Sequence, residues 1–143
     1  MQEVETKIEV RLNNTEDPQK VVQAVSNIAC CEEPTFLEQE YGKLMFFHGS
    51  GKESLSPLKR LLFERKILSA ARKMIRSGQS GNVFRFCLNK QAAYSAQVSF
   101  CEEVGESPLG PLVVEVTAID PEAFLDWLAP RAMGDETSDD SCR

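Results

Sequence analysis

The chain has 143 residues, of which 42% are hydrophobic and 27% are charged, and its formal net charge is -6. These values fit one folded domain with its own core, and they argue against disordered, fibrous and membrane-spanning classes. No apolar run approaches the roughly 20 residues of a transmembrane helix, and the charged N-terminal segment lacks the apolar centre of a secretory signal. We therefore expect a cytoplasmic protein with no membrane partner. We predict a single α+β domain over residues 1–130 and a disordered acidic tail over residues 131–143.

The N-terminal part of the sequence predicts a strand followed by a short helix. Hydrophobic and charged side chains alternate from Glu3 to Leu12, which is the pattern of a strand with one solvent-facing side. The segment 14–18, NTEDP, then supplies helix-cap candidates and a proline suited to a first turn, and apolar residues follow at helical spacing as far as Ile28. The segment 34–41 is ambiguous, whereas residues 43–47 favour a second strand.

Residues 55–77 resemble one long helix, but the positions of their apolar side chains predict a break. At about 100° per residue, the early leucines would lie nearly opposite the later apolar residues if the helix were straight. A bend near residues 63–65 would let both apolar stripes reach one core. Gly78 stands where a helix C-cap is expected.

The second half of the chain predicts three strands and a final helix. The strands cover residues 83–88, 94–100 and 112–119, and ESPLGP at 106–111 marks a turn. Asp120-Pro121 opens a helix over residues 122–128, in which we expect Phe124 and Trp127 to face the core. The order β-α-β-α-α-β-β-β-α predicts an α+β fold with two layers, in which helices cover one face of a mixed or largely antiparallel sheet.

No motif indicates catalysis, a metal site or a cofactor. HGSGKES at 48–54 resembles the end of a phosphate-binding loop, but Glu53 stands where Ser or Thr is required, so we interpret the segment as a polar loop. His48 is the only histidine, and the five cysteines have no regular spacing. We predict that the protein is not an enzyme and uses neither a metal nor a cofactor.

Positive charge is concentrated in the middle of the chain. Between Lys52 and Lys90, ten basic residues stand against two acidic ones, a local balance of +8. On a helical wheel, basic rows lie opposite the apolar stripe, so the whole basic face can stay in water and follow a phosphate backbone. An ordinary solvated helix face is the alternative interpretation. The rows are Arg65, Arg72 and Arg76, and Lys66 and Lys73, with Lys59 extending the second row if the bend is mild.

A polar segment, Asn89-Lys90-Gln91, joins two of the predicted strands near this positive charge, and Arg85 lies in the first of them. Asn and Gln side chains can hydrogen-bond base edges, and Lys can bind phosphate. The same side chains can instead satisfy the backbone of a turn.

Five motifs in this order resemble the archaeal uncharacterised protein family 0201. That family is described as predicted RNA-binding, is related to a predicted exosome-associated archaeal group, and has a two-layer fold similar to ribosomal large-subunit protein five. Some of its members resemble fusions to a P-loop nucleotide-kinase-like domain. The resemblance implies RNA binding and no established catalytic residue. The motifs are TEDPQKV (Thr15–Val21), ERKILSAARKMI (Glu64–Ile75), LNKQAA (Leu88–Ala93), SPLGP (Ser107–Pro111) and DWLAP (Asp126–Pro130).

We predict a non-enzymatic RNA-binding protein. The alternative is a protein-interaction module or accessory subunit, whose basic face meets a P-loop kinase-like partner or an RNA-processing complex. The residues predicted to contact RNA are Lys59, Arg65, Lys66, Arg72, Lys73, Arg76, Arg85, Asn89, Lys90 and Gln91.

Overall fold

The computed structural model describes residues 4–13, 15–39, 42–101 and 111–130. Its strands are β1 (Val4–Asn13), β2 (Thr35–Gln39), β3 (Gly42–Ser50), β4 (Gln79–Ser80), β5 (Val83–Asn89), β6 (Phe100–Cys101) and β7 (Pro111–Ala118). Its helices are α1 (Pro18–Ser26), α2 (Ser56–Glu64), α3 (Leu68–Ser77), α4 (Lys90–Tyr94) and α5 (Pro121–Leu128), and a 3-10 turn, η1 (Lys52–Leu55), precedes α2. The predicted tail at 131–143 and most of the predicted turn at 106–111 lie outside the described residues.

The strands form one antiparallel sheet in the order β2-β3-β1-β7-β5-β4, and β6 pairs with β5. The register places Ile8 of β1 opposite Phe47 of β3 and Val114 of β7, and all three side chains are buried. Side chains alternate between the two faces of a strand, so the next residues along β1, Lys7 and Glu9, lie on the other face. The predicted first strand with one wet face is therefore confirmed.

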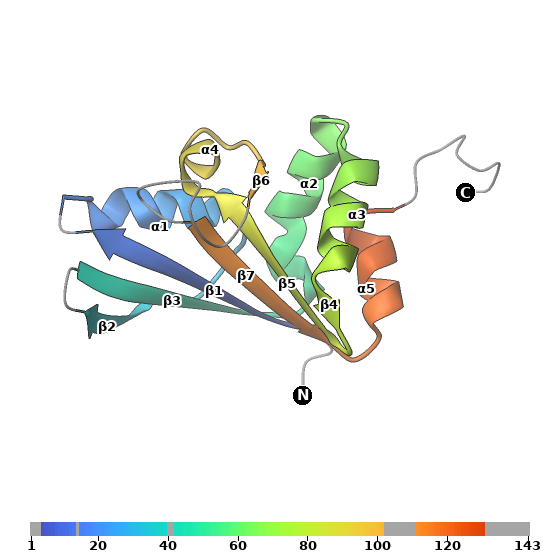
Figure 1. Ribbon diagram of the computed structural model, residues 1–143, viewed down its shortest axis with the longest axis horizontal. Coiled ribbons are helices and arrows are strands. Elements are labelled where there is room, and N and C mark those ends of the chain that lie inside the picture. The colour runs from blue at the N-terminus through green and yellow to red at the C-terminus, as the bar shows by residue number, and fades with distance from the viewer. Residues whose placement is uncertain (1–3, 14, 40–41, 102–110, 131–143) are drawn as a thin grey trace.

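The helices cover the buried face of this sheet. Figure 1 shows α1 and α4 along one end of the sheet and α2, α3 and α5 along the other. Buried side chains of the helices, among them Val25, Leu62, Ile75 and Leu125, join the buried side chains of the sheet in one core. The predicted α+β fold, with helices on one face, is confirmed.

The predicted break within residues 55–77 is confirmed. α2 ends at Glu64 and α3 begins at Leu68, and Lys66 between them has a φ of 59°, which a continuing right-handed helix does not allow. Gly78 is the C-cap of α3, as predicted, but its φ of -99° is not left-handed. A Cβ at Gly78 would lie 1.9 Å from the carbonyl oxygen of Arg85, so the close approach of β5 requires glycine there.

The predicted strand over residues 94–100 is wrong. The side chain of Asn89 accepts a hydrogen bond from the backbone N–H of Ala92 at 2.9 Å and starts α4, which runs to Tyr94. Ala96 then has a φ of 54°, and only Phe100–Cys101 pair with β5. The cap at Asn89 thus places Tyr94 in a helix, and the positive φ of Ala96 interrupts the extended backbone that a strand over 94–100 would need.

The segment 48–54 is more ordered than the predicted polar loop. Residues 48–50 complete β3, which extends beyond the predicted 43–47, and η1 begins at Lys52. Ser54 is buried, and its hydroxyl donates to the carbonyl oxygen of Gly51 at 2.9 Å. The ambiguous segment 34–41 contains β2, an edge strand paired with β3.

Candidate nucleic-acid interface

The bend between α2 and α3 separates the basic residues that the helical wheel had grouped. Arg65 and Lys66 lie in the turn before α3, so they do not continue the rows of that helix. Within α3, Arg72 and Arg76 make contacts with α5, whereas Lys73 is exposed. The expectation that the whole basic face stays in water is therefore wrong for Arg72, which is largely buried, and Arg76 is exposed but paired with α5.

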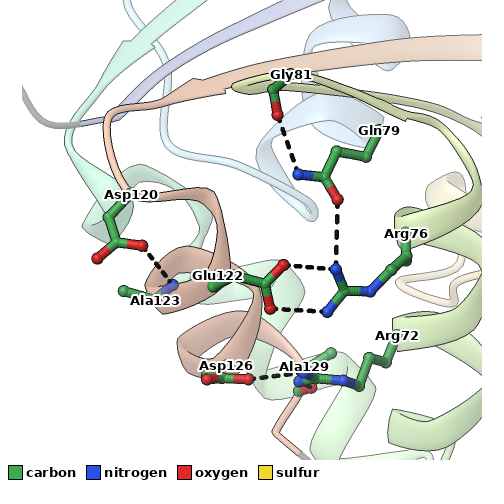
Figure 2. A network of polar contacts seen from close by, with 9 residues as sticks. All are labelled: Arg72, Arg76, Gln79, Gly81, Asp120, Glu122, Ala123, Asp126 and Ala129. Atoms are coloured by element: carbon green, nitrogen blue, oxygen red, sulfur yellow. Dashed lines mark hydrogen bonds and ion pairs between the residues drawn. The ribbon is translucent and has the colours of Figure 1, made fainter.

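Two arginines of α3 hold α5 against the rest of the molecule (Figure 2). The Arg72 guanidinium donates to the backbone carbonyl oxygen of Ala129 at 3.0 Å and pairs with Asp126 at 2.8 Å, and its side chain is only 13% exposed. The Arg76 guanidinium binds both carboxylate oxygens of Glu122, with Nη2 at 2.9 Å from Oε1. These hydrogen bonds raise the pKa of Arg76. Both residues thus position a helix within the protein.

Lys59 of α2 also contacts α5. Its ammonium donates to the backbone carbonyl oxygen of Trp127 at 2.7 Å and lies 5.3 Å from the centre of the Trp127 ring. Carbonyl groups in the last turn of a helix lack intrahelical partners and favour nearby cations. Lys59 and Arg72 therefore meet the C-terminal end of α5, at Trp127 and Ala129.

Lys90 is a buried structural residue. Its ammonium donates to the backbone carbonyl oxygen of Arg11 at 2.7 Å and to both carboxylate oxygens of Glu16, at 3.0 and 3.1 Å. The side chain of Lys90 is 0% exposed and that of Glu16 is 7% exposed. Burial lowers the pKa of Lys90, and the hydrogen bonds and charge of Glu16 oppose that change. The contact ties α4 to β1 and to the segment before α1.

The other predicted residues in and after β5 differ in their exposure and in their contacts. Asn89 caps α4 through its side chain. Arg85 pairs with Glu115 of the neighbouring strand at 3.6 Å, on the face of the sheet opposite the core. Gln91 is exposed in the first turn of α4. Asn89 thus satisfies local backbone, which was the alternative interpretation of this segment, whereas the partners of Lys90 are distant in the chain and gave no local signal.

Four cations that follow one another along α2, the turn and α3 face solvent. Arg60, Lys66 and Lys73 are exposed, and Arg65 is exposed with one long contact of 3.4 Å to the carbonyl oxygen of Ala96. The prediction omitted Arg60. Its signal in the sequence was its place on the polar side of α2, away from the buried Leu58, Leu61 and Leu62. We call Arg60, Arg65, Lys66 and Lys73 the basic surface.

A groove of about 680 Å³ lies beside this surface, between α2 and the end of α5. Arg60 and Phe63 line it from α2, and Phe63 is 69% exposed. Trp127 lines it from α5 and also packs against the core, where its ring lies 6.3 Å from that of Phe124. Trp127 was predicted to face the core and does so in part, whereas Phe124 is buried.

The described residues meet the requirements of neither a metal cluster nor a membrane-spanning helix. No group of three or more His, Cys, Asp or Glu side chains within residues 4–13, 15–39, 42–101 and 111–130 could hold a metal ion. No helix in these ranges is long and apolar enough to cross a membrane.

The chain matches a known family along most of its length. A family model described as RNA binding matches residues 5–118. The UPF0201 protein of Sulfurisphaera tokodaii is 40% identical over 124 residues, which cover 87% of this chain and 86% of the relative. The chain belongs to the UPF0201 family. This confirms the resemblance predicted from the five motifs.

Other UPF0201 proteins agree in sequence and fold. The relative from Pyrobaculum neutrophilum is 40% identical over 129 residues, covering 90% of this chain and 89% of its own. The crystal structure of a UPF0201 protein from Methanococcus jannaschii superposes with a TM-score of 0.78 at 32% identity, covering 91% of this chain and 96% of that one. The groove lies partly outside the matched family model, because Trp127 follows residue 118.

Proposed function

We propose that this protein binds RNA through the basic surface. The observation that carries the proposal is the family model described as RNA binding, because it spans α2, the turn and α3 within residues 5–118. Its description is of binding, which supports a non-enzymatic role, and we propose that this role is exercised in the cytoplasm.

The geometry supports the choice of these four cations. Arg60, Arg65, Lys66 and Lys73 are exposed, so their charged groups can reach phosphate oxygens without leaving a structural contact of the core. Phosphate contacts supply most of the sequence-independent affinity of nucleic-acid-binding proteins. Gln91 is exposed on α4, and its contact with RNA stays a prediction.

The remaining predicted residues serve the interface indirectly in this proposal. Lys59, Arg72 and Arg76 hold α5, and Asn89 and Lys90 hold α4. Direct contact between RNA and any of these residues, or Arg85, stays a prediction.

The experiment compares two triple charge reversals. The interface variant is Arg65→Glu/Lys66→Glu/Lys73→Glu, and the control is Lys7→Glu/Lys20→Glu/Lys43→Glu. Each reversal removes two charge units, so three take the formal net charge from -6 to -12 in both variants. Arg72 is left unchanged because its reversal would release α5. Binding to a fluorescent single-stranded RNA at low salt is measured by anisotropy, after circular dichroism has shown that both variants fold.

We expect the interface variant to lose binding by about tenfold or more, since three phosphate contacts are replaced by repulsion. The control should retain most of the wild-type affinity. Equal loss in both variants would show that only net charge matters and would contradict the proposed surface. Absence of RNA binding by the wild-type protein at low salt would contradict the function itself, and a stoichiometric protein partner surviving nuclease treatment of a native lysate would favour the interaction-module alternative.

A further inference from the structure

We propose that the groove between α2 and the end of α5 receives one unpaired base of a single-stranded RNA, with the adjoining phosphate held by Lys52 and Arg60. The inference rests on the proposed RNA binding and deepens it. It adds a base-stacking site, including Trp127, to a surface so far described only by its charge.

The aromatic side chains of the groove supply a stacking site. Phe63 is 69% exposed on α2, an unusual setting for a large apolar side chain on a helix whose Leu58, Leu61 and Leu62 are buried. Trp127 lines the same groove from α5 while its contact with Phe124 fixes it against the core. Proteins that bind single strands stack unpaired bases on such aromatic rings.

The charges around the rings are those that a nucleotide needs. Lys59 and Arg60 line the groove together with one acid, Glu53, and Lys52 lies near the Trp127 ring. Three cations near two aromatic rings suit a ligand that combines a flat ring with an anionic group. A nucleotide of RNA is such a ligand, and a groove of about 680 Å³ is in the range of small-ligand sites.

The two lysines near Trp127 have different freedom to move. Lys59 is held by its 2.7 Å hydrogen bond to the backbone carbonyl oxygen of Trp127, so it stays at the end of α5. Lys52 is exposed and lies 5.5 Å from the centre of the indole ring. Base stacking on an aromatic ring is stronger than an exposed cation–π contact, so a base can take the place of the Lys52 ammonium, which then turns to the phosphate.

The groove also adjoins the basic surface. Arg60 belongs to both, and the turn that carries Arg65 and Lys66 follows directly after Phe63 and Glu64 in the chain. A single strand that crosses the turn can therefore place its phosphates on the basic surface and turn one base into the groove.

Trp127 is the single tryptophan of the chain, so its fluorescence reports on this site alone. The full-length protein is titrated with a short single-stranded RNA, with an abasic oligonucleotide of the same length, and with an RNA duplex. Binding is measured in parallel by anisotropy of labelled RNA. We expect the single strand to quench Trp127 with the same midpoint as the anisotropy, and the abasic strand and the duplex to leave the fluorescence nearly unchanged.

Substitution tests the stacking separately from the charge. Phe63→Ala should weaken single-strand binding at least about fivefold, because one stacking partner is removed. The matched control is Met74→Ala, which removes an exposed apolar side chain of α3 outside the groove and should leave binding unchanged. Lys73→Glu should lower the affinity while the quenching at saturation stays the same.

The outcomes distinguish the groove from the function on which it rests. Binding of RNA with neither quenching of Trp127 nor an effect of Phe63→Ala would contradict base binding in the groove but not the proposed RNA binding. Equal quenching by the abasic strand would also contradict base binding in the groove, because the quenching would then not need a base. Failure of the wild-type protein to bind any RNA would overturn both.

Discussion

Lys90 shows how a residue that resembles a surface cation in the sequence can be a buried part of the core. In the sequence it lies between two polar residues, Asn89 and Gln91, which suggests an exposed position. In the structure its ammonium is enclosed by Glu16 and the backbone of Arg11. A buried ion pair is poor evidence for net stability, but removing one partner leaves the other charge buried and unpaired.

Lys90→Met is therefore expected to lower the free energy of unfolding by about 3 kcal/mol, measured by urea denaturation. Lys73→Met, the same change at an exposed position, should alter it by no more than about 0.5 kcal/mol. The double variant Lys90→Met/Glu16→Gln should recover part of the loss, because the carboxylate charge is gone. Equal stability of the two single variants would contradict the structural role of Lys90.

The raised pKa of the Cys31 thiol is expected to make the free energy of unfolding depend on pH in the alkaline range. Burial, aided by the charges of Cys30 and Glu32, raises the pKa of the Cys31 thiol from 9.0 to about 11. Between these values the unfolded chain has released this proton while the folded chain still holds it, so unfolding becomes more favourable as the pH rises. The contribution is intact below pH 9 and is lost as the pH rises towards 11.

The check is the urea midpoint of the wild type and of Cys31→Ala, each measured below pH 9 and near pH 11. The wild type should lose more stability across this interval than the variant does, whatever the two proteins' stabilities at the lower pH. Identical losses would show that the raised thiol pKa is not coupled to folding.

At the scale of elements, α5 depends on contacts from α2 and α3 that cross its C-terminal end. Arg72→Ala removes the hydrogen bond to Ala129 and the ion pair with Asp126 from a side chain that is largely buried. We expect a loss of about 1–2 kcal/mol in the free energy of unfolding and faster hydrogen exchange of the α5 amides. Lys73→Ala is the control on the same helix, and an effect of Arg72→Ala no larger than the control's would contradict the role of Arg72 in holding α5.

The elements most accurately predicted from the sequence were those with strong local signals. Alternation revealed β1, and the mismatch between two apolar stripes revealed the break that Lys66 makes between α2 and α3. The strand predicted over residues 94–100 failed because Tyr94 ends the short helix that Asn89 caps, and only Phe100 of that segment pairs with β5. Local patterns could not reveal α4, since the burial of Lys90 in its first turn depends on Glu16, which is distant in the chain.

The candidate site was less predictable than the fold for a related reason. The sequence located the positive charge, but a helical wheel cannot tell which charged side chains meet another helix. Arg72 and Arg76 found partners on α5, whose Asp126 and Glu122 lie about fifty residues further along the chain. The groove likewise exists only because α5 packs beside α2. No pattern in the sequence therefore indicated that Phe63 and Trp127 line a groove.

For the whole molecule, the separation of charge along the chain would allow an acidic protein to bind RNA as proposed. The formal net charge is -6, whereas the segment from Lys52 to Lys90 carries +8 in sequence. Acids from other segments pair with part of that charge, and the basic surface holds cations that stay exposed. At physiological ionic strength the Debye length is about 8 Å, so acidic groups further away than this repel a bound strand only weakly. The local basic surface then decides the interaction, provided that its cations contact phosphates.

Salt dependence is the most direct measurement of that contact. The dissociation constant of the full-length protein for a single-stranded RNA is measured between about 50 and 200 mM salt. Four phosphates neutralised by Arg60, Arg65, Lys66 and Lys73 predict a slope of about -3 for log affinity against log salt, and Lys73→Ala should reduce its magnitude by about 0.7. A slope near zero, or a slope that Lys73→Ala leaves unchanged, would contradict RNA binding through the basic surface.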